Sequence, residues 1–320
     1  MRKILVVVLC FTLALGLAGC GGDIEELDTK INVGTWKTAQ TIQPFFYQDY
    51  LKDPIEVLPF TNPGDMKAAL LADSLDMCGT TIVTAITAAS KGEPVVLVSG
   101  LSNKCSALVV AKDSDINTAK DLKGKRIAYV PGTMHHLLLL EVLSNNGINP
   151  EEDVELIRID FFDMGQALAQ GTIDAFYSGE PYPSIAVAEG YGKILLYPDD
   201  NEGFGIINSA MMTTKDKIKN NPKVIQKLVM AHMKATEHLK KDREAWLNKA
   251  YEFGTDREVL YVSADNIELF WDIDDHYIES VKNLAQRMFE QGLITEVPDV
   301  NEIFDLRFIK NAEKELHNEK

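Results

Sequence analysis

The chain has 320 residues, with 48 acidic and 32 basic side chains and a formal net charge of −16 at pH 7. Such an acidic surface argues against nucleic acid as a partner and requires that any anion-binding site be built locally. The length exceeds one typical domain and suggests two lobes, and of the four cysteines only Cys78 and Cys105 lie beyond residue 20, too few for a disulfide framework.

The N-terminal segment has the pattern of an export signal. Two basic residues precede a long apolar run that carries no charge before Asp23. A run of this length at the extreme N-terminus, ending in small residues, is typical of a cleaved signal, with an uncleaved membrane anchor as the alternative. Residues 17–20, LAGC, resemble the bacterial lipobox. That resemblance implies a signal peptide over residues 1–19, a lipid on Cys20 and a tethered linker over residues 20–29.

Further along the chain, predicted strands alternate with predicted helices, and this alternation indicates a mostly parallel α/β sheet. The pattern predicts strands at residues 30–36, 55–60, 75–79, 94–101, 125–130, 154–159 and 173–179. It predicts helices at residues 42–51, 66–72, 81–90, 162–170 and 184–192. The chain is expected to be largely helical after Asn221.

Two pairs of segments repeat each other along the chain. Residues 70–81 and residues 167–180 both predict a short helix, a turn and a strand preceded by aspartate. Residues 106–113 and residues 209–216 share Ser, Ala, Lys and Asp at the same offsets. Chance similarity between apolar strands is the alternative. Taken together, the pairs indicate two lobes of similar plan, each leading into a comparable strand that crosses between the lobes.

The order of these features resembles the extracytoplasmic solute-binding proteins of ABC importers, and within them the nitrate/sulfonate/taurine branch. Three stretches carry the resemblance: GDMKAALLADSLDMCGTT, DLKGKRIAYVPGTMHHLLL and GTIDAFYSGEPYPSIA. It implies the two-lobed periplasmic-binding-protein type II fold, in which each lobe is a mixed, mostly parallel sheet flanked by helices and two crossover strands form the hinge. The implied lobes are residues 27–108 with 210–320, and residues 109–209.

The same resemblance implies a function. We expect a monomeric receptor, tethered outside the cytoplasm by its lipid, that captures a small polar or anionic organic solute of sulfonate, taurine or nitrate type between its lobes. Its partners would be the permease and ATPase subunits of the importer, and it would use no cofactor and catalyse no reaction. The alternatives are a receptor for a pyrimidine or another thiamine- or riboflavin-related precursor, a sensing module for a membrane kinase, or an enzyme on the same fold.

In open α/β sheets, ligands bind at the carboxyl ends of strands beside helix N-termini. In the first lobe, Trp36 ends a strand and Gln40 precedes a helix, so they offer an aromatic wall and an amide. Trp36 is alternatively an ordinary core residue. Gly79 lets the backbone approach a ligand closely, and Thr80 and Thr81 offer hydroxyls and free amides at a helix start. Either threonine is a cap, a ligand contact or both.

In the second lobe, a strand ends at a Pro-Gly turn that includes Gly132, and Thr133 is a natural N-cap. Met134, His135 and His136 then occupy the first helical turn, whose backbone N–H groups suit a carboxylate, sulfonate or nitrate. His135 aligns with a histidine of many taurine- and sulfonate-type members. We therefore expect it to face the cleft or brace the helix start, with His136 turned to the surface or to packing.

The adjacent histidines are not expected to bind a metal. Successive helical residues point about 100° apart, so the two side chains cannot easily hold one ion, and the chain has no HxxxH pair. A catalytic histidine would need a nucleophile and an orienting acid. We therefore predict neither a metal site nor a catalytic residue.

The last segment of the predicted site is FYSGEPYP, residues 176–183. Tyr177 and Tyr182 would add aromatic walls. Glu180 would either accept hydrogen bonds from an amino group of the ligand or pair with the N-terminus of the following helix, which also favours a carboxylate. Cys78 and Cys105 form either one disulfide in an oxidising compartment or two buried free thiols.

Overall fold

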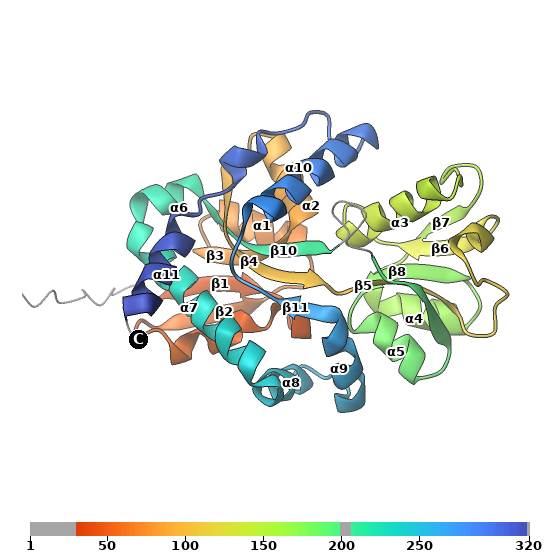
Figure 1. Ribbon diagram of the computed structural model, residues 1–320, viewed down its shortest axis with the longest axis horizontal. Coiled ribbons are helices and arrows are strands. Elements are labelled where there is room, and N and C mark those ends of the chain that lie inside the picture. Colours follow the sequence, from red (N-terminus) through yellow and green to blue (C-terminus); the bar gives the residue numbers. More distant parts are fainter. Residues whose placement is uncertain (1–29, 199–205, 319–320) are drawn as a thin grey trace, which may run out of the picture.

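A computed structural model describes residues 30–198 and 206–318. The proposed signal peptide, Cys20 and its linker lie outside the described residues. The described elements form two α/β lobes that lie side by side along the longest axis of the molecule (Figure 1). Within the described part of the chain, no helix is both long and apolar enough to cross a membrane.

The first lobe is built on a six-stranded sheet with the order β11-β4-β10-β3-β1-β2. Strand β1 is parallel to β2 and β3, whereas β10 is antiparallel to β3 and β4. These strands are β1 (Ile31–Thr35), β2 (Ile55–Pro59), β3 (Met77–Thr81), β4 (Val95–Lys104), β10 (Ile207–Thr214) and β11 (Ile267–Leu269).

The second lobe has a five-stranded sheet with the order β7-β6-β8-β5-β9. Strand β6 is parallel to β7 and β8, and β5 is antiparallel to β8 and β9. This repeats the arrangement β2-β1-β3-β10-β4 of the first sheet, so the similar plan predicted from the repeats is confirmed. The strands are β5 (Ser106–Ala111), β6 (Arg126–Tyr129), β7 (Glu155–Arg158), β8 (Ala175–Gly179) and β9 (Gly192–Leu196).

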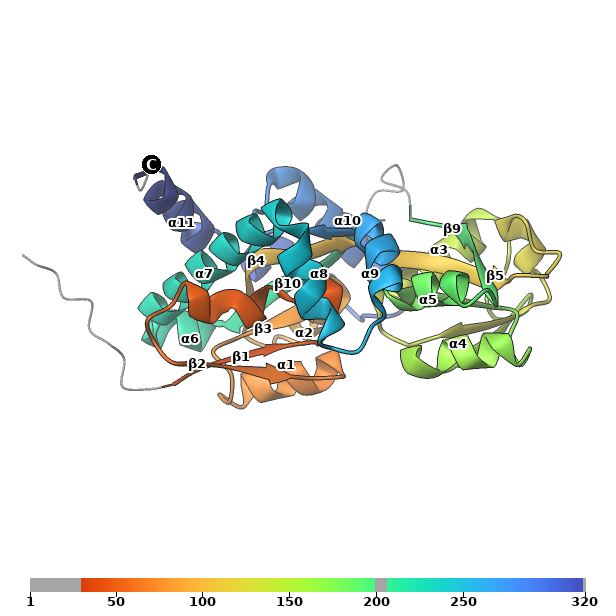
Figure 2. The ribbon, with the colours of Figure 1, turned by 90° about the horizontal axis from the view of Figure 1, so that it is seen from below.

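Helices cover both faces of each sheet (Figure 1, Figure 2). The first lobe has α1 (Pro63–Leu71), α2 (Ile82–Ser90), α6 (Lys215–Asn220), α7 (Pro222–Lys241), α8 (Arg243–Tyr251), α9 (Arg257–Ser263), α10 (Asp275–Glu290) and α11 (Arg307–Asn318). The second lobe has α3 (Met134–Asn145), α4 (Phe161–Ala169) and α5 (Tyr182–Ala188). Short 3-10 helices are η1 (Ala39–Thr41), η2 (Gln43–Asp49), η3 (Ala119–Leu122), η5 (Ala264–Asn266) and η6 (Val300–Ile303).

The helix predicted over residues 42–51 is instead the 3-10 helix η2, which the short turn η1 precedes. Side-chain hydrogen bonds to distant elements hold this segment: Gln43 Nε2 donates to the Leu101 carbonyl at 2.7 Å, and Tyr47 Oη lies 2.7 Å from Nδ1 of His232 on α7. Tertiary bonds therefore fix a short segment whose apolar period alone suggested one regular helix.

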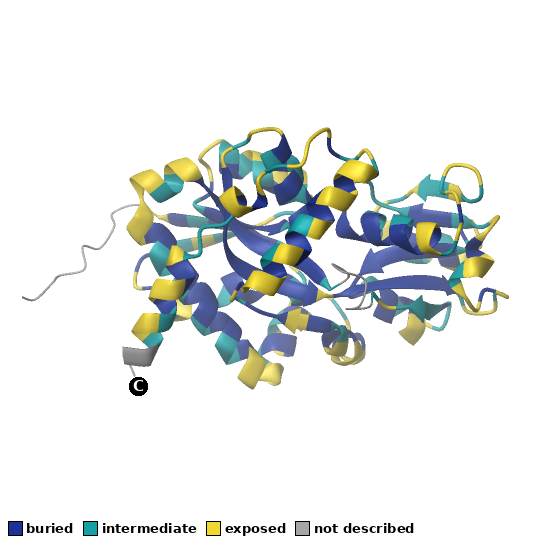
Figure 3. Ribbon diagram, turned by 45° about the horizontal axis from the view of Figure 1, so that its top comes forward, coloured by how far each residue is buried: buried dark blue, intermediate teal, exposed yellow. Residues whose placement is uncertain are grey.

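The central strands of both sheets are buried (Figure 3). All eight residues of β10 are buried, as are all five of β8. A strand covered on both faces can read as a continuous apolar run, as β4 does, whereas the half-polar β10 was marked only by its similarity to residues 106–113. The lobes also touch outside the sheets, because α5 of the second lobe packs against α9 of the first.

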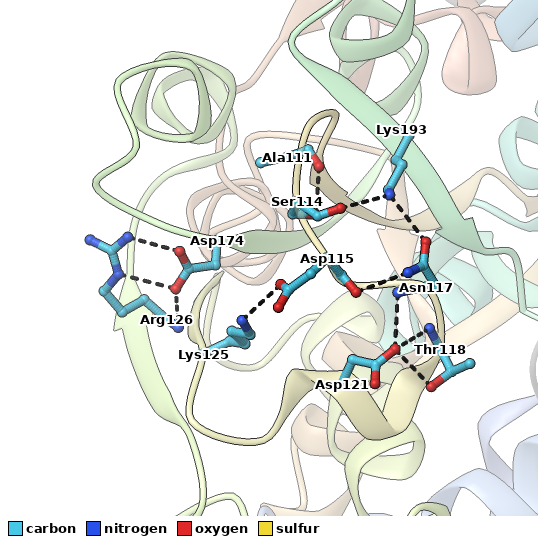
Figure 4. Close-up of polar contacts among 10 residues, drawn as sticks. All are labelled: Ala111, Ser114, Asp115, Asn117, Thr118, Asp121, Lys125, Arg126, Asp174 and Lys193. Carbon is cyan, nitrogen blue, oxygen red and sulfur yellow. Dashed lines mark hydrogen bonds and ion pairs between the residues drawn. The ribbon is translucent and has the colours of Figure 1, made fainter.

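One aspartate in each lobe fastens the strand that follows it to the neighbouring parallel strand, β3 to β1 in the first lobe and β8 to β6 in the second. Asp76 donates its N–H to the Asn32 carbonyl at 2.8 Å and accepts the Asn32 N–H at 2.9 Å through its carboxylate. Asp174 makes the same pair of bonds with the backbone of Arg126, both at 2.8 Å. A basic side chain completes each cluster. Lys217 pairs with Asp76 in the first lobe. In the second lobe, Arg126 pairs with Asp174, as Figure 4 shows. The aspartates shared by the repeated segments therefore build the fold.

Candidate ligand-binding site

The strand directions bring the predicted site segments of the two lobes to the boundary between them. Strand β4 ends at Lys104 and β5 begins at Ser106, so the chain passes from one sheet to the other at Cys105. Since β10 is antiparallel to β4 and β3 is antiparallel to β10, the carboxyl ends of β3 and β1 lie on the crossover side. By the same reasoning, the carboxyl ends of β8 and β6 in the second sheet point back toward the first.

In the first lobe, the structure brings Trp36 and the end of β3 together. A Cβ atom placed on Gly79 would lie 3.0 Å from Cζ3 of the half-buried Trp36, so the indole lies on the bare glycine backbone. Thr81 caps α2 by accepting the Thr84 N–H at 3.1 Å, and the buried Thr80 donates to the Thr81 carbonyl at 3.2 Å. The predicted helix start after β3 is confirmed.

Gln40 lies on the turn η1, just beyond Trp36. Gln40 is half-buried, and its Oε1 atom is buried without a hydrogen-bond partner among the described residues. An unpaired buried acceptor is unfavourable, so this carbonyl is available to a donor brought by a ligand or by water.

In the second lobe, Thr133 is the N-cap of α3, as predicted. Its hydroxyl accepts the His136 N–H at 3.3 Å and donates to the Val130 carbonyl at 2.8 Å. Gly132 has φ +72°, a left-handed conformation that favours glycine, and it is exposed. Met134 is 1% exposed, so its side chain packs into the interior of the second lobe.

His135 is buried where the two lobes meet. Its Nδ1 atom lies 3.0 Å from the Ser106 hydroxyl, and its ring meets Phe161 edge-on at 5.3 Å. A Cβ on Gly179 would lie 2.9 Å from Nε2, so the imidazole fills the space that this glycine leaves. Burial lowers the pKa of His135 to about 4, and the ring is therefore neutral at pH 7. His136 packs against Tyr129 with ring centroids 4.6 Å apart.

Glu180 is 2% exposed and both of its carboxylate oxygens are used. Oε2 accepts the Ser184 N–H at 3.2 Å in the first turn of α5, and Oε1 accepts from Asn266 Nδ2 at 3.1 Å. Desolvation raises the pKa of this carboxyl. Of the two roles that the sequence left open for Glu180, the bond to Ser184 matches the pairing with the following helix. Tyr177, three residues earlier in β8, is wholly buried in the apolar core.

Asn266, which the sequence did not single out, joins Glu180 to the crossover. The Cys105 N–H donates to the Asn266 carbonyl at 2.7 Å, and the Glu180 N–H donates to the Cys105 carbonyl at 2.7 Å. With the bond from Asn266 to Glu180, these three residues form a closed ring of hydrogen bonds that includes both lobes. Lys104 and Cys105 both have positive φ, 60° and 64°, which marks the sharp change of chain direction.

A family model described as "NMT1/THI5 like" matches residues 48–245. The chain belongs to the NMT1/THI5-like family. A Bacillus subtilis (strain 168) protein named for the binding of aliphatic sulfonates is 25% identical over 327 residues, which cover 98% of this chain and 96% of that protein. An Escherichia coli (strain K12) protein of the same name is 27% identical over 198 residues, 61% of this chain and 60% of the relative.

Solved structures with the same fold include binding proteins of two kinds. The periplasmic aliphatic sulphonate-binding protein SsuA from Escherichia coli superposes with a TM-score of 0.75 at 22% identity, covering 85% of this chain and 91% of that one. The periplasmic nitrate-binding protein NrtA from Synechocystis PCC 6803 also gives 0.75, at 18% identity, covering 90% and 89%. The predicted family and the two-lobed fold class are therefore confirmed.

In this member of the NMT1/THI5-like family, Cys78 and Cys105 are free thiols. Cys78 lies within β3 and Cys105 at the crossover, and both are buried. Burial raises the pKa of both thiols, so neither is poised as a thiolate. Among the described residues, no group of three or more His, Cys, Asp or Glu side chains could hold a metal ion.

Proposed function

We propose that this protein is the solute-binding component of an ABC importer and that it captures a small polar or anionic organic solute, of sulfonate type, between its two lobes. The names of its relatives support the class of solute. One observation carries the proposal: α2 and α3, one helix from each lobe, begin at threonine caps at strand ends that point toward the other lobe. Helix starts offer unpaired N–H groups and a positive dipole end, which suit an anion on a strongly acidic protein.

The proposed contacts come from both lobes. The first lobe contributes Trp36, Gln40, Thr80 and Thr81, and the second contributes the backbone and side chains of Gly132, Thr133, Met134 and His135, backed by the buried Tyr177 and Glu180. A solute that touches both sides stabilises the closed arrangement, and the permease would recognise that state. We propose that the first lobe comprises residues 27–108 with 210–320 and that the second comprises residues 109–209. The first boundary between them lies close to the crossover at Cys105.

Calorimetry and thermal unfolding test the proposal directly. The purified protein is titrated with taurine, methanesulfonate, butanesulfonate, nitrate, bicarbonate and a pyrimidine. We expect a sulfonate to raise the melting temperature by mass action and the others to do so less. Trp36→Ala should abolish the shift, whereas Phe289→Ala, an exposed aromatic on α10, should leave it intact. If no compound raises the melting temperature, the proposal is wrong; if only the pyrimidine does, the alternative solute class is correct.

We further propose that Cys20 is lipidated and anchors the protein outside the cytoplasm. The motif LAGC at residues 17–20 supports this, and Cys10 in the same leader provides a matched control. Expressed in a bacterial host, the wild-type chain and Cys10→Ser should partition into detergent and gain the mass of a lipid on Cys20. Cys20→Ser should lose both properties. Equal partitioning of Cys20→Ser would instead favour an uncleaved N-terminal anchor.

A further inference from the structure

Four aromatic rings form a continuous row at the carboxyl end of the second sheet. His135 of α3 meets Phe161 of α4 edge-on, and Phe161 stacks on Tyr182 of α5 with ring centroids 6.4 Å apart and planes 14° apart. Phe162 then meets Tyr182 edge-on at 5.6 Å. The three helices follow β6, β7 and β8, whose carboxyl ends point toward the first lobe.

The row runs from the interior to the surface. His135 is 9% exposed, Phe161 and Tyr182 are half-buried, and Phe162 is 68% exposed. Phe162 is the most exposed large apolar side chain of the described residues. An aromatic ring left in water while it packs against a second aromatic ring gains little for folding, because most of its apolar area stays exposed.

Helix capping does not explain these aromatic residues. The equivalent helices of the first lobe, α1 and α2, begin at Asn62 and Thr81, whose side chains accept backbone N–H groups. In the second lobe, α4 begins after Asp160 without a side-chain cap bond, and its first two residues are Phe161 and Phe162. The first two residues of α1 and α2 are Pro63-Gly64 and Ile82-Val83, so aromatic rings in the first turns of these equivalent helices are specific to the second lobe.

We propose that Phe161, Tyr182 and Phe162 form a subsite for an apolar group, aryl or long alkyl, carried by the solute. This inference rests on the proposed function. The row begins at His135, in the first turn of α3 behind the Thr133 cap, where the charged or polar head would bind. From there the rings offer a path of apolar surface toward solvent, along which a tail attached to that head would lie. The solute would therefore be an arenesulfonate or a long alkanesulfonate rather than taurine, methanesulfonate or an inorganic anion.

A ligand series of constant head group tests the subsite. Dissociation constants of the purified protein are measured by calorimetry for methanesulfonate, butanesulfonate, octanesulfonate, benzenesulfonate and naphthalene-2-sulfonate. We expect affinity to rise about threefold for each methylene group that becomes buried, and naphthalenesulfonate to bind more tightly than methanesulfonate by at least about 30-fold. In Phe162→Ala the long and aromatic members should weaken about tenfold while methanesulfonate is unchanged. Phe289→Ala serves as the matched control on an exposed phenylalanine of another helix.

The outcomes separate this inference from the function on which it rests. If no sulfonate binds, the proposed function fails and the subsite with it. If sulfonates bind with the same affinity whatever their tail, the proposed function stands and the subsite is wrong. The subsite is also wrong if Phe162→Ala weakens every member equally or none of them, because the side chain then acts on the fold or on another surface.

Discussion

The hydrogen-bond ring at the crossover predicts that Asn266→Ala destabilises the protein in a pH-dependent way. The variant removes the Asn266 donor from Oε1 of Glu180, a bond of 3.1 Å, and a longer bond of 3.4 Å to the Ser106 carbonyl. A hydrogen bond to a charged group contributes about 1.5–3 kcal/mol, more than a neutral one. Glu180 keeps its hydrogen bonds with Ser184, so we expect a loss of about 2 kcal/mol in the free energy of unfolding at pH 8.

The dependence on pH follows from the raised pKa of Glu180. The folded protein binds a proton at a pH where the unfolded chain, with an ordinary glutamate pKa of about 4.3, does not. Protonation therefore favours the folded state as the pH falls through the raised pKa toward about 4.3. A neutral carboxyl depends less on the Asn266 donor. The loss caused by Asn266→Ala should be full above the raised pKa and should shrink below it.

Urea denaturation followed by tryptophan fluorescence at pH 8, 6.5 and 5 measures these differences. In a Glu180→Gln background the same substitution should have a smaller effect that does not change with pH. Asn145→Ala, at an exposed position on α3, is the control and should stay within about 0.5 kcal/mol of wild type. A loss that is equal at all three pH values and in both backgrounds would refute the reasoning, because Asn266 would then act through packing alone.

Three further substitutions test other parts of the fold by denaturation. Gly100→Ala should cost about 2–3 kcal/mol, because its Cβ would lie 2.3 Å from the Phe270 ring; an unchanged midpoint would mean that the ring moves freely. Asp174→Asn should cost about 1 kcal/mol at pH 7, since Arg126 lowers the pKa of this partly exposed carboxyl, and the difference should vanish as the pH falls through that pKa. His232 is buried and neutral with a pKa of about 4, so its contribution to stability should be lost as the pH falls from 6.5 to 4, and stability should fall less over that range in His232→Gln than in wild type.

The general architecture was predictable because it depends on local patterns. Buried strands such as β4 give continuous apolar runs, and the repeated segments that contain Asp76 and Asp174 marked equivalent places in the two sheets. Helix starts at Thr81 and Thr133 were predictable for the same reason, since capping uses a side chain two or three residues from the backbone group it satisfies.

The contacts between distant segments could not be predicted in this way. Asn266 is 86 residues from Glu180 and 160 from Ser106, and no pattern in the sequence links them. Phe161 and Phe162 were also missed, because apolar residues at the start of an amphipathic helix read as part of its buried face. Only the exposure of Phe162 in the folded structure separates it from a core residue.

The two lobes share a strand order but differ in chemistry at equivalent places. The first lobe's α1 and α2 begin with Pro63-Gly64 and Ile82-Val83, whereas aromatic rings stand in the first turns of the second lobe's α4 and α5. Because the lobes share a strand order, the helix starts of one lobe lie opposite those of the other. Two equivalent sets of helix N-termini would suit a symmetric anion. Divergence of one set toward aromatic residues favours a solute with two unlike ends, one that needs N–H donors and one that needs apolar surface. Exchanging the aromatic set for alanine should therefore flatten selectivity between solutes more than it lowers affinity for the smallest of them.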